Sequence, residues 1–223
     1  MTVTKRILLL MASLRVTPLG TGPGRLVCIA TLVACISWLG IAGGAATAGP
    51  LHDAAREGDA ARVAQLLAQG VDVNSRDENR ETPLMDAALA GKAEVAALLI
   101  EAHADIEARN DRGFTALHAA AYSGSLEIAK LLLDHGAEVD ALSAHKITPL
   151  HVAAEENQTA VAELLIAHGA QVEAIQEYGY TPLSRATFFQ SAQVMVLLKK
   201  HGAKCQPKET MGASYAPCVA AGN

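Results

Sequence analysis

Apolar residues recur along the chain in short groups with helical spacing, and polar stretches separate the groups. Three groups place apolar side chains on one face of a helix: Val95, Leu98, Leu99 and Ile100; Ile128, Leu131, Leu132 and Leu133; Val161, Leu164, Leu165 and Ile166. Each group begins 33 residues after the previous one. Each of these groups is preceded by a second group with small apolar side chains, which contains paired alanines: Ala87-Ala88, Ala120-Ala121 and Ala153-Ala154. The pattern predicts helix pairs repeated at a fixed interval, with the alanines allowing close packing.

Two turn motifs recur in the same register. The first motif reads Thr-Pro-Leu or Thr-Ala-Leu and begins at Thr82, Thr115, Thr148 and Thr181. Pro50-Leu51-His52 lies one interval earlier. The second motif closes a unit with a glycine, at Gly70, Gly136, Gly169 and Gly202. Because chance does not hold two motifs in one register over five units, residues 49–205 are interpreted as an internal repeat.

The motifs also predict where the helices begin and end. A threonine can cap the free N–H groups at a helix start, and proline fits the first helical position. Left-handed residues are expected to end the first helix of each unit: Gly58, Gly91, Gly124, Asn157 and the less suitable Gln190. His103 stands where other units have the second stop glycine, so we expect a cost of about 1 kcal/mol there.

On these motifs the chain resembles the ankyrin-repeat family. The resemblance covers five units of 33 residues, the last one shortened: 49–81, 82–114, 115–147, 148–180 and 181–205. It implies an all-α solenoid in which helix-turn-helix units are joined by hairpin-like loops. It also implies that the loop tips and the first helices form a concave face, which in this family binds another protein.

The terminal units differ from the inner units as a solenoid requires, because its two end faces meet water. Arg62 occupies the first-unit position that corresponds to the apolar Val95, and Gln65 corresponds to Leu98. At the other end, Lys199 occupies an apolar slot of the inner units. We therefore expect the array to start and stop within this chain, with residues 206–223 as a C-terminal tail.

Residues 1–48 follow a different pattern. They contain four basic residues and no acidic one, then an apolar run over 26–42, and they end with Ala46-Thr47-Ala48. This order is typical of a secretory signal peptide. Cleavage after Ala48 would start the mature chain at Gly49, where the repeats begin. We therefore expect a periplasmic or secreted protein.

Two other interpretations of this segment stay open. The apolar run could be retained as an N-terminal membrane anchor, although it is shorter than the roughly 20 apolar residues that a spanning helix needs. Leu32-Val33-Ala34-Cys35 resembles a bacterial lipobox, which would attach a lipid to Cys35. Apolar residues continue past this cysteine, where a lipoprotein tether is usually polar. In both cases the repeats would face the periplasm.

The composition supports a helical array, and the formal charge differs between the whole chain and the repeat region. The 44 alanines, 27 leucines and 4% of aromatic residues favour packed helices over a β-sandwich or barrel. The whole chain has a formal charge of −5, but residues 49–223 hold 14 basic and 23 acidic residues, a charge of −9. Anionic surfaces repel such a domain. We expect no nucleic-acid partner and no membrane contact beyond the leader.

The histidines do not predict a metal site. His52, His118 and His151 fall in one repeated slot, where the family resemblance implies hydrogen bonds between turns. Met85 and Ser184 take this slot in the other units, so no set of four ligands lines up. The histidines before the stop glycines are expected to be solvated: His135, His168 and His201.

Motifs of catalysis are also missing from the sequence. It contains no phosphate-binding loop, nucleophile elbow or metalloprotease spacing. Glu155 and Glu156 are adjacent carboxylates on a first helix, and we interpret them as a solvated acidic edge rather than a catalytic pair. We expect no catalytic residue, no metal and no cofactor.

Two cysteines, Cys205 and Cys218, remain outside the leader. Cys205 occupies the apolar slot of Val172, so it could be a simple buried residue. Export favours pairing, because the compartment is oxidising. The sharper hypothesis is therefore a Cys205–Cys218 disulfide that fastens the tail over the last repeat and contributes about 3 kcal/mol.

The tips between units change character along the chain. Early tips are charged: Arg76, Asp77, Glu78, Arg80 and Glu81, then Arg109, Asp111 and Arg112. Later tips and the nearby first helices carry apolar and aromatic residues: Phe114, Tyr122, Leu142, Ile147, Ile175, Tyr178, Tyr180 and Phe188. Since nearly all the aromatic residues occupy slots that the core does not need, we interpret them as anchors for a protein partner.

We therefore predict one set of partner-binding residues, in which the arginines steer the partner: Arg76, Arg109, Arg112, Phe114, Tyr122, Ile147, Tyr178, Tyr180 and Phe188. For Phe188 and Phe189, filling space near the C-terminal end is an alternative role.

The leading functional hypothesis is a monomeric, non-catalytic protein-binding module or scaffold in the bacterial envelope. A narrower alternative is a stoichiometric inhibitor or immunity-type protein that blocks a toxin or an enzyme. A remote alternative is an accessory factor of an enzyme, with a metal or catalytic site.

Overall fold

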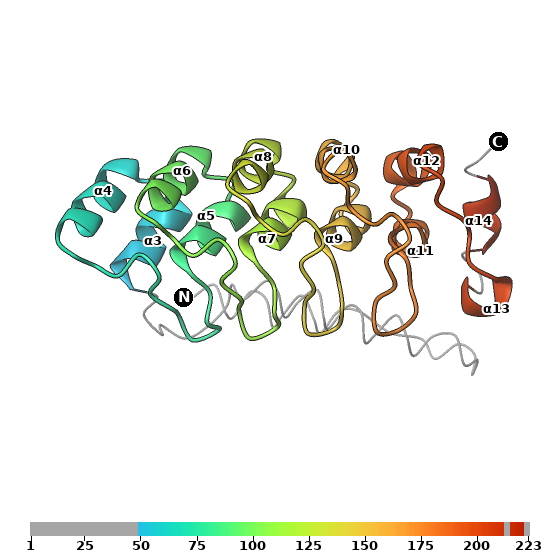
Figure 1. Ribbon diagram of the computed structural model, residues 1–223, viewed down its shortest axis with the longest axis horizontal. Coiled ribbons are helices and arrows are strands. Elements are labelled where there is room, and N and C mark those ends of the chain that lie inside the picture. Colours follow the sequence, from blue (N-terminus) through green and yellow to red (C-terminus); the bar gives the residue numbers. More distant parts are fainter. Residues whose placement is uncertain (1–48, 212–214, 221–223) are drawn as a thin grey trace, which may run out of the picture. The chain divides into compact units, whose positions relative to one another are not determined.

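The computed structural model describes residues 49–211 and 215–220, which form helices and no strand. The all-α repeat prediction is confirmed (Figure 1). The predicted leader, its cleavage site and Cys35 lie outside the described residues. Within the described range, no helix is long and apolar enough to cross a membrane.

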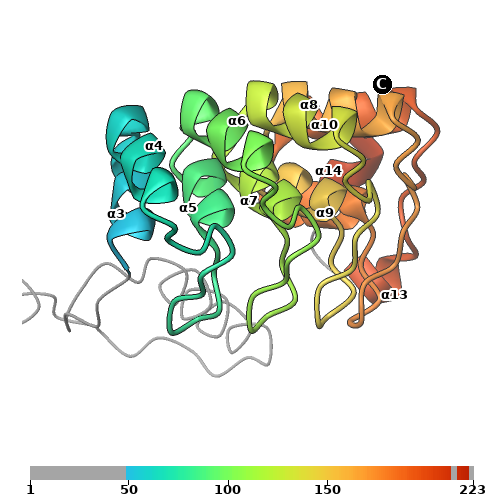
Figure 2. The same ribbon diagram turned by 60° about the vertical axis from the view of Figure 1, so that its left-hand side comes forward.

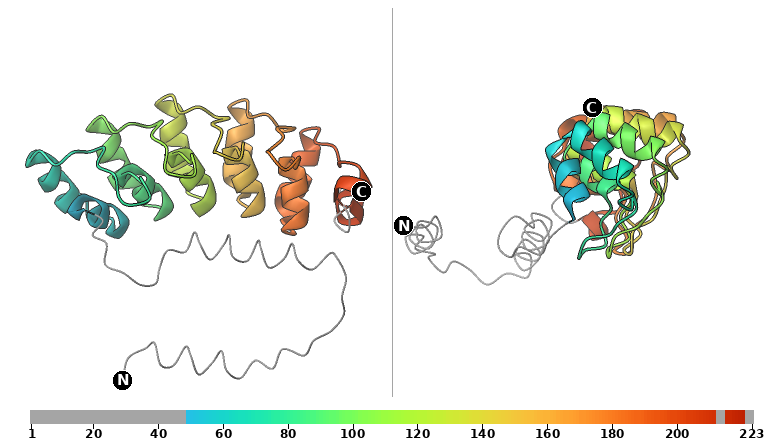
Figure 3. Two further views of the ribbon diagram at one scale, coloured as in Figure 1. Left: turned by 90° about the horizontal axis from the view of Figure 1, so that it is seen from below. Right: turned by 90° about the vertical axis from the view of Figure 1, so that its left-hand side faces the viewer.

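Five helix pairs follow one another along the chain, and two short helices end it. The pairs are α3 (Pro50–Glu57) with α4 (Ala60–Ala68), α5 (Pro83–Leu89) with α6 (Ala93–Glu101), α7 (Ala116–Ser123) with α8 (Leu126–Asp134), α9 (Pro149–Glu155) with α10 (Thr159–Ala167), and α11 (Pro182–Phe188) with α12 (Ala192–Lys200). The short helices are α13 (Lys208–Met211) and α14 (Tyr215–Ala220). First helices form one row and second helices another, with the connecting loops on the side of the first helices (Figures 1 and 3).

The helix caps and the left-handed residues at helix ends lie where the sequence predicts them. The Oγ1 atoms of Thr82, Thr148 and Thr181 accept hydrogen bonds from backbone N–H groups three residues later, at 3.3–3.4 Å. Proline begins the first helix in four of the five described pairs. The first helices end at left-handed residues, including Asn157 with φ 56° and Gln190 with φ 61°. His103 also adopts φ 64°, as its position requires.

The core runs through the array between the two rows of helices. Each inner repeat buries one leucine from each of its helices, such as Leu117 and Leu132. Burial of each leucine contributes about 2 kcal/mol. The paired alanines, such as Ala120 and Ala121, are also buried, because neighbouring first helices pack closely there. Arg62 on the first pair is exposed, so the polar end face predicted from the sequence is confirmed.

The C-terminal tail closes the other end of the array. Its helix α14 packs against α11, and Cys218 of α14 is fully buried. The predicted Cys205–Cys218 disulfide is confirmed, with Cα atoms 6.0 Å apart. Lys199 Nζ donates a hydrogen bond to the carbonyl oxygen of Val219 at 3.3 Å. The tail therefore covers the last repeat with two short helices, which the sequence pattern did not predict.

Candidate functional site

Four loops connect each second helix to the next first helix and project from the helical layers on one side (Figure 2). We call them tip loops 1 to 4: residues 74–81, 107–114, 140–147 and 173–180. Each tip loop folds back through a backbone hydrogen bond of 3.0–3.1 Å, as between Asp77 N–H and the Glu81 carbonyl. One residue in each turn has a positive φ: Arg80, Gly113, Lys146 and Gly179.

The main chain also joins each tip loop to the next one. Three N–H groups, those of Asp111, Ala144 and Glu177, donate to carbonyl oxygens of the preceding tip loop at 2.8–3.0 Å. A row of side chains adds a second link by accepting backbone N–H groups 31 residues later: Asn74, Glu107, Asp140 and Glu173. These bonds align consecutive tip loops along the array.

The predicted steering residues Arg76 and Arg109 are tied to the array. Arg76 Nη1 donates to the carbonyl oxygen of Arg109 at 2.7 Å. One unit later, Arg109 Nη1 donates to the carbonyl oxygen of Leu142, and Arg109 Nη2 lies 3.6 Å from Glu138. These guanidinium groups therefore link consecutive tip loops, a role that the sequence did not suggest. Arg112 is exposed on tip loop 2.

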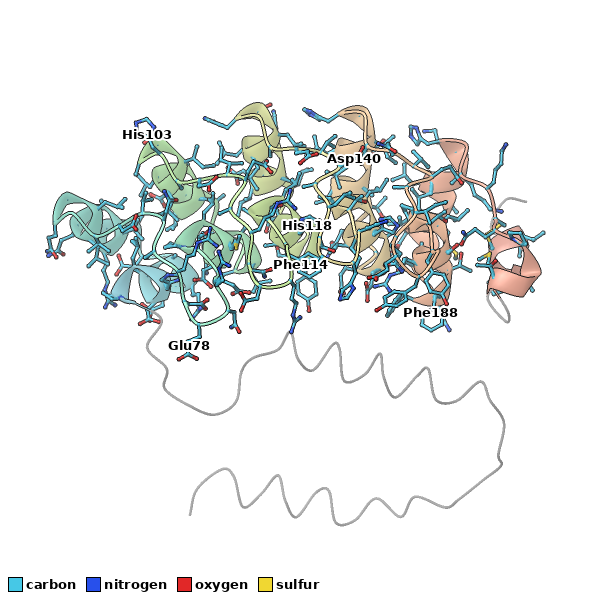
Figure 4. The ribbon with its side chains drawn as sticks, turned by 60° about the horizontal axis from the view of Figure 1, so that its bottom comes forward. Glu78, His103, Phe114, His118, Asp140 and Phe188 are labelled. Carbon is cyan, nitrogen blue, oxygen red and sulfur yellow. A yellow bond between two sulfur atoms is a disulfide. The ribbon has the colours of Figure 1, made fainter. Side chains whose placement is uncertain are left out.

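Tip loops 3 and 4 have apolar residues in the slot of these arginines. Leu142 and Ile175 are 48% and 61% exposed, and Tyr178 of tip loop 4 is 65% exposed. Phe188 on α11 is 43% exposed (Figure 4), and its ring meets the Phe189 ring edge-on with the centroids 5.3 Å apart. We call these four residues the apolar patch. Leu142 and Ile175 were recognised in the sequence as tip residues but not as anchors, although their replacement of arginine was a usable signal.

The other predicted anchors are partly used by the fold. Phe114, Tyr122 and Ile147 are half-buried and pack against the core. Phe114 meets the His118 ring edge-on at 5.1 Å (Figure 4). Tyr180 is half-buried at the end of tip loop 4. The expectation that nearly all aromatic residues lie away from the core is therefore wrong for Phe114 and Tyr122, since each fills space beside a first helix.

Two buried histidines fasten tip loops 3 and 4 to the first helices. His118 Nδ1 accepts a hydrogen bond from the Thr115 N–H at 3.2 Å, so its Nε2–H donates to the Ile147 carbonyl at 2.9 Å. His151 donates in the same way to the Tyr180 carbonyl at 3.1 Å. Burial lowers the pKa of both imidazoles from 6.5 to about 4. Both are neutral structural groups near neutral pH.

The first repeat departs from this arrangement. His52 Nδ1 lies 2.7 Å from the buried Asp86 carboxylate instead of following the bonding of His118. Arg56 Nε donates to the other carboxylate oxygen of Asp86 at 2.7 Å. Burial raises the pKa of Glu81, and the neighbouring Asp86 and Asp77 carboxylates raise it further. The exception arises because Asp86 brings a carboxylate to a slot that is apolar in the next two units.

A second charged group lies on α9 and α11. Arg185 forms an ion pair with Glu155, and the guanidinium also lies over the Phe189 ring, 5.1 Å from its centroid. The interpretation of Glu155 as part of a solvated edge is therefore wrong, because the paired side chains are only 17–20% exposed. Burial raises the pKa of Glu156, and the adjacent Glu155 adds to the effect.

Among residues 49–211 and 215–220, no cluster of three or more His, Cys, Asp or Glu side chains could hold a metal ion. His135, His168 and His201 are exposed, as expected.

These elements define a solenoid of helical repeats with projecting loops. The chain belongs to the ankyrin-repeat family: the family model for ankyrin repeats, which holds three copies, matches residues 51–143 and 140–209. Ankyrin repeats typically bind other proteins and are not catalytic. No curated protein matches the chain in a sequence comparison.

Proposed function

We propose that this chain is a non-catalytic protein-binding module of the bacterial envelope and that it binds its partner through the apolar patch and the neighbouring first helices. The observation that carries the proposal is the exposure of Ile175 and Tyr178 on a tip loop that is already fastened by main-chain bonds. The hydrogen bonds that hold this loop come from its main chain, and the only ring contact of Tyr178 within the described residues is with His145 of tip loop 3, at 5.9 Å between centroids.

Exposed clusters of this kind are favourable sites for association. A large apolar side chain that reaches 61–65% exposure retains most of its transfer free energy for a partner to use. Aromatic anchors on rigid supports also lose little conformational entropy on binding. The hydrogen bonds between tip loops and the His151 bond to the Tyr180 carbonyl supply that rigidity.

A photo-crosslinking experiment in the producing cell tests the binding surface. A crosslinking amino acid replaces Tyr178 in one variant and the exposed Glu163 of α10 in the matched control. We expect a discrete crosslinked protein from position 178 and none from position 163. The Ile175→Ala substitution should reduce the yield from a crosslinker at position 142. Equal crosslinking from both faces would overturn the assignment.

The envelope location rests on the sequence of residues 1–48. Intact-mass measurement of the purified protein should give a chain that begins at Gly49, recovered from the periplasmic fraction. Recovery of the unprocessed chain in the cytoplasm would contradict export. An uncleaved chain in the inner membrane, or a lipid adduct on Cys35, would replace the periplasmic assignment with one of the two anchored forms.

A further inference from the structure

The apolar patch is interspersed with carboxylates. Glu177 lies between Ile175 and Tyr178 on tip loop 4, and its side chain is 52% exposed. Glu177 Oε2 lies 2.6 Å from His145 Nδ1, and the carboxylate remains accessible to solvent beside that contact. Glu155 occupies the position on α9 that Phe188 occupies on the adjacent α11. Glu177 is therefore an acidic neighbour of Ile175 and Tyr178 along tip loop 4.

Basic side chains do not balance these carboxylates. Residues 140–156 and 173–188 contain five carboxylates and two basic residues, Lys146 and Arg185. Arg185 is already bound to Glu155 and stacked on Phe189. Glu156 is half-buried and forms no ion pair within the described part of the chain. With five carboxylates and two basic residues, these two stretches have a formal charge of −3 and carry the exposed apolar residues.

Tip loop 4 also breaks a local rule that the other three tip loops obey. Asp77, Asn110 and Ser143 each accept two backbone N–H bonds within their own turn. Gln176 takes this position in tip loop 4, and its amide is buried with neither polar atom hydrogen-bonded. Broken local rules of this kind concentrate at functional sites. This observation singles out tip loop 4 independently of its charge.

We propose that the apolar patch recognises a protein segment in which apolar side chains are flanked by lysine or arginine. This inference rests on the proposed function and specifies the partner. Aliphatic or aromatic groups of the segment contact Ile175 and Tyr178, and a basic group reaches Glu177. A second basic group reaches Glu156 at the end of α9, which packs against the helix that carries Phe188, and an aromatic face also attracts cations.

Charge complementarity separates this occupant from the other candidates. An acidic segment would bring like charges against Glu177 and Glu156. A second copy of this chain would do the same, because residues 49–223 carry a formal charge of −9. A segment with both basic and apolar residues avoids the like-charge repulsion and also covers the exposed side chains of Ile175 and Tyr178.

The probe for the test is a library of short random peptides displayed on phage and selected against the full chain as its host produces it. The affinities of the selected peptides are then measured by titration against the unmodified protein and its variants. We expect Lys and Arg to be enriched next to apolar residues. Glu177→Gln or Glu156→Gln should weaken binding about tenfold, and added salt should weaken it further. The control Glu163→Gln, on the exposed face of α10, should leave it unchanged.

The outcomes separate the two proposals. Peptides that lose binding with Tyr178→Ala but show no basic enrichment, and that ignore Glu177→Gln, would overturn the partner chemistry and leave the binding surface standing. Peptides unaffected by both Tyr178→Ala and Ile175→Ala would overturn the surface itself. Selection of acidic peptides would contradict the inferred charge preference directly.

Discussion

Tip loops 1 and 2 and tip loops 3 and 4 share one backbone and differ in what their side chains do. In the first two, Arg76 and Arg109 reach across to the next tip loop and bond its carbonyl oxygen. In the last two, Leu142 and Ile175 occupy the same slot and point no donor at the next unit. The main-chain bonds between tip loops continue through all four. Because tip loops 3 and 4 keep the same backbone without an arginine, the arginine links are not required for the fold of the tip loops.

The two regions also differ in how the tip loops are attached to the helices. The imidazoles of His118 and His151 hold tip loops 3 and 4, whereas His52 is bound to Asp86. Tip loop 1 is attached to α3 through its side chains, with Ser75 Oγ 3.4 Å from His52 Nε2 and Asp77 3.5 Å from Arg56 Nη2, whereas tip loops 3 and 4 are attached through their main-chain carbonyls. In tip loops 3 and 4, rigid attachment of the main chain and exposed apolar side chains occur together, which is the combination that a binding site needs.

The largest expected effect is acid sensitivity of the histidine attachments. The folded-state pKa of His118 and His151 is about 4, below the unfolded value of 6.5, so the unfolded chain binds more protons as the pH falls. The stability is present above pH 6.5 and is lost between pH 6.5 and 4, by about 3 kcal/mol for each histidine. Urea unfolding at several pH values measures it. His118→Gln should flatten the dependence; the exposed His135→Gln should leave it unchanged.

Loss of the disulfide should affect only the C-terminal region. Cys218→Ser removes the link that closes the tail, at a cost of about 3 kcal/mol in the chain-entropy model. Hydrogen exchange should accelerate in α11, α12 and α14 and stay unchanged in α3 to α6, because repeats contact only their neighbours. Uniform acceleration along the array would show that the ends are coupled more strongly than the packing suggests.

Two glycines with left-handed φ angles provide a matched pair between the tip loops. A Cβ on Gly113 would lie 2.7 Å from the backbone nitrogen of Ala144, whereas a Cβ on Gly179 would meet no atom within 4 Å. Gly113→Ala should cost about 2–3 kcal/mol, from strain plus the displaced tip loop. Gly179→Ala should cost about 1 kcal/mol, from strain alone. Thermal unfolding of both variants compares them, and equal costs would disprove the close approach of tip loops 2 and 3.

The smallest effect concerns the arginine links themselves. Arg109→Ala removes the bond to the Leu142 carbonyl and should lower the free energy of unfolding by about 1 kcal/mol.

Leu142→Arg tests the reverse change, because the introduced guanidinium could donate to tip loop 4 as Arg109 donates to tip loop 3. We expect it to leave the unfolding midpoint within a few degrees of the unmodified protein and to abolish crosslinking from position 178. Retained crosslinking would show that Leu142 is outside the partner contact.

The sequence predicted the parts of the fold that are set by local rules. Threonine caps, stop glycines and the left-handed Asn157 each act within one turn, so their spacing was sufficient. The polar Arg62 predicted the exposed end face for the same reason. The disulfide could be inferred because only Cys205 and Cys218 lie outside the leader.

The remaining features depend on distances between units, which spacing does not supply. The Arg76 bond to the Arg109 carbonyl requires the two tip loops to lie side by side at a definite separation. The switch of His52 to Asp86 depends on a side chain 34 residues away. Phe114 was interpreted as exposed because its slot is a loop position, yet the loop folds it against His118.

The capped C-terminal end has a consequence for assembly. A solenoid that ends without a cover presents a face shaped to receive another repeat, much as an open sheet edge can recruit a further strand. The short helix α14 stands on α11 where a sixth unit would begin, and the Cys205–Cys218 bond holds it there. The tail thus covers the surface of α11 on which a further repeat would stack, and the disulfide keeps it in that place.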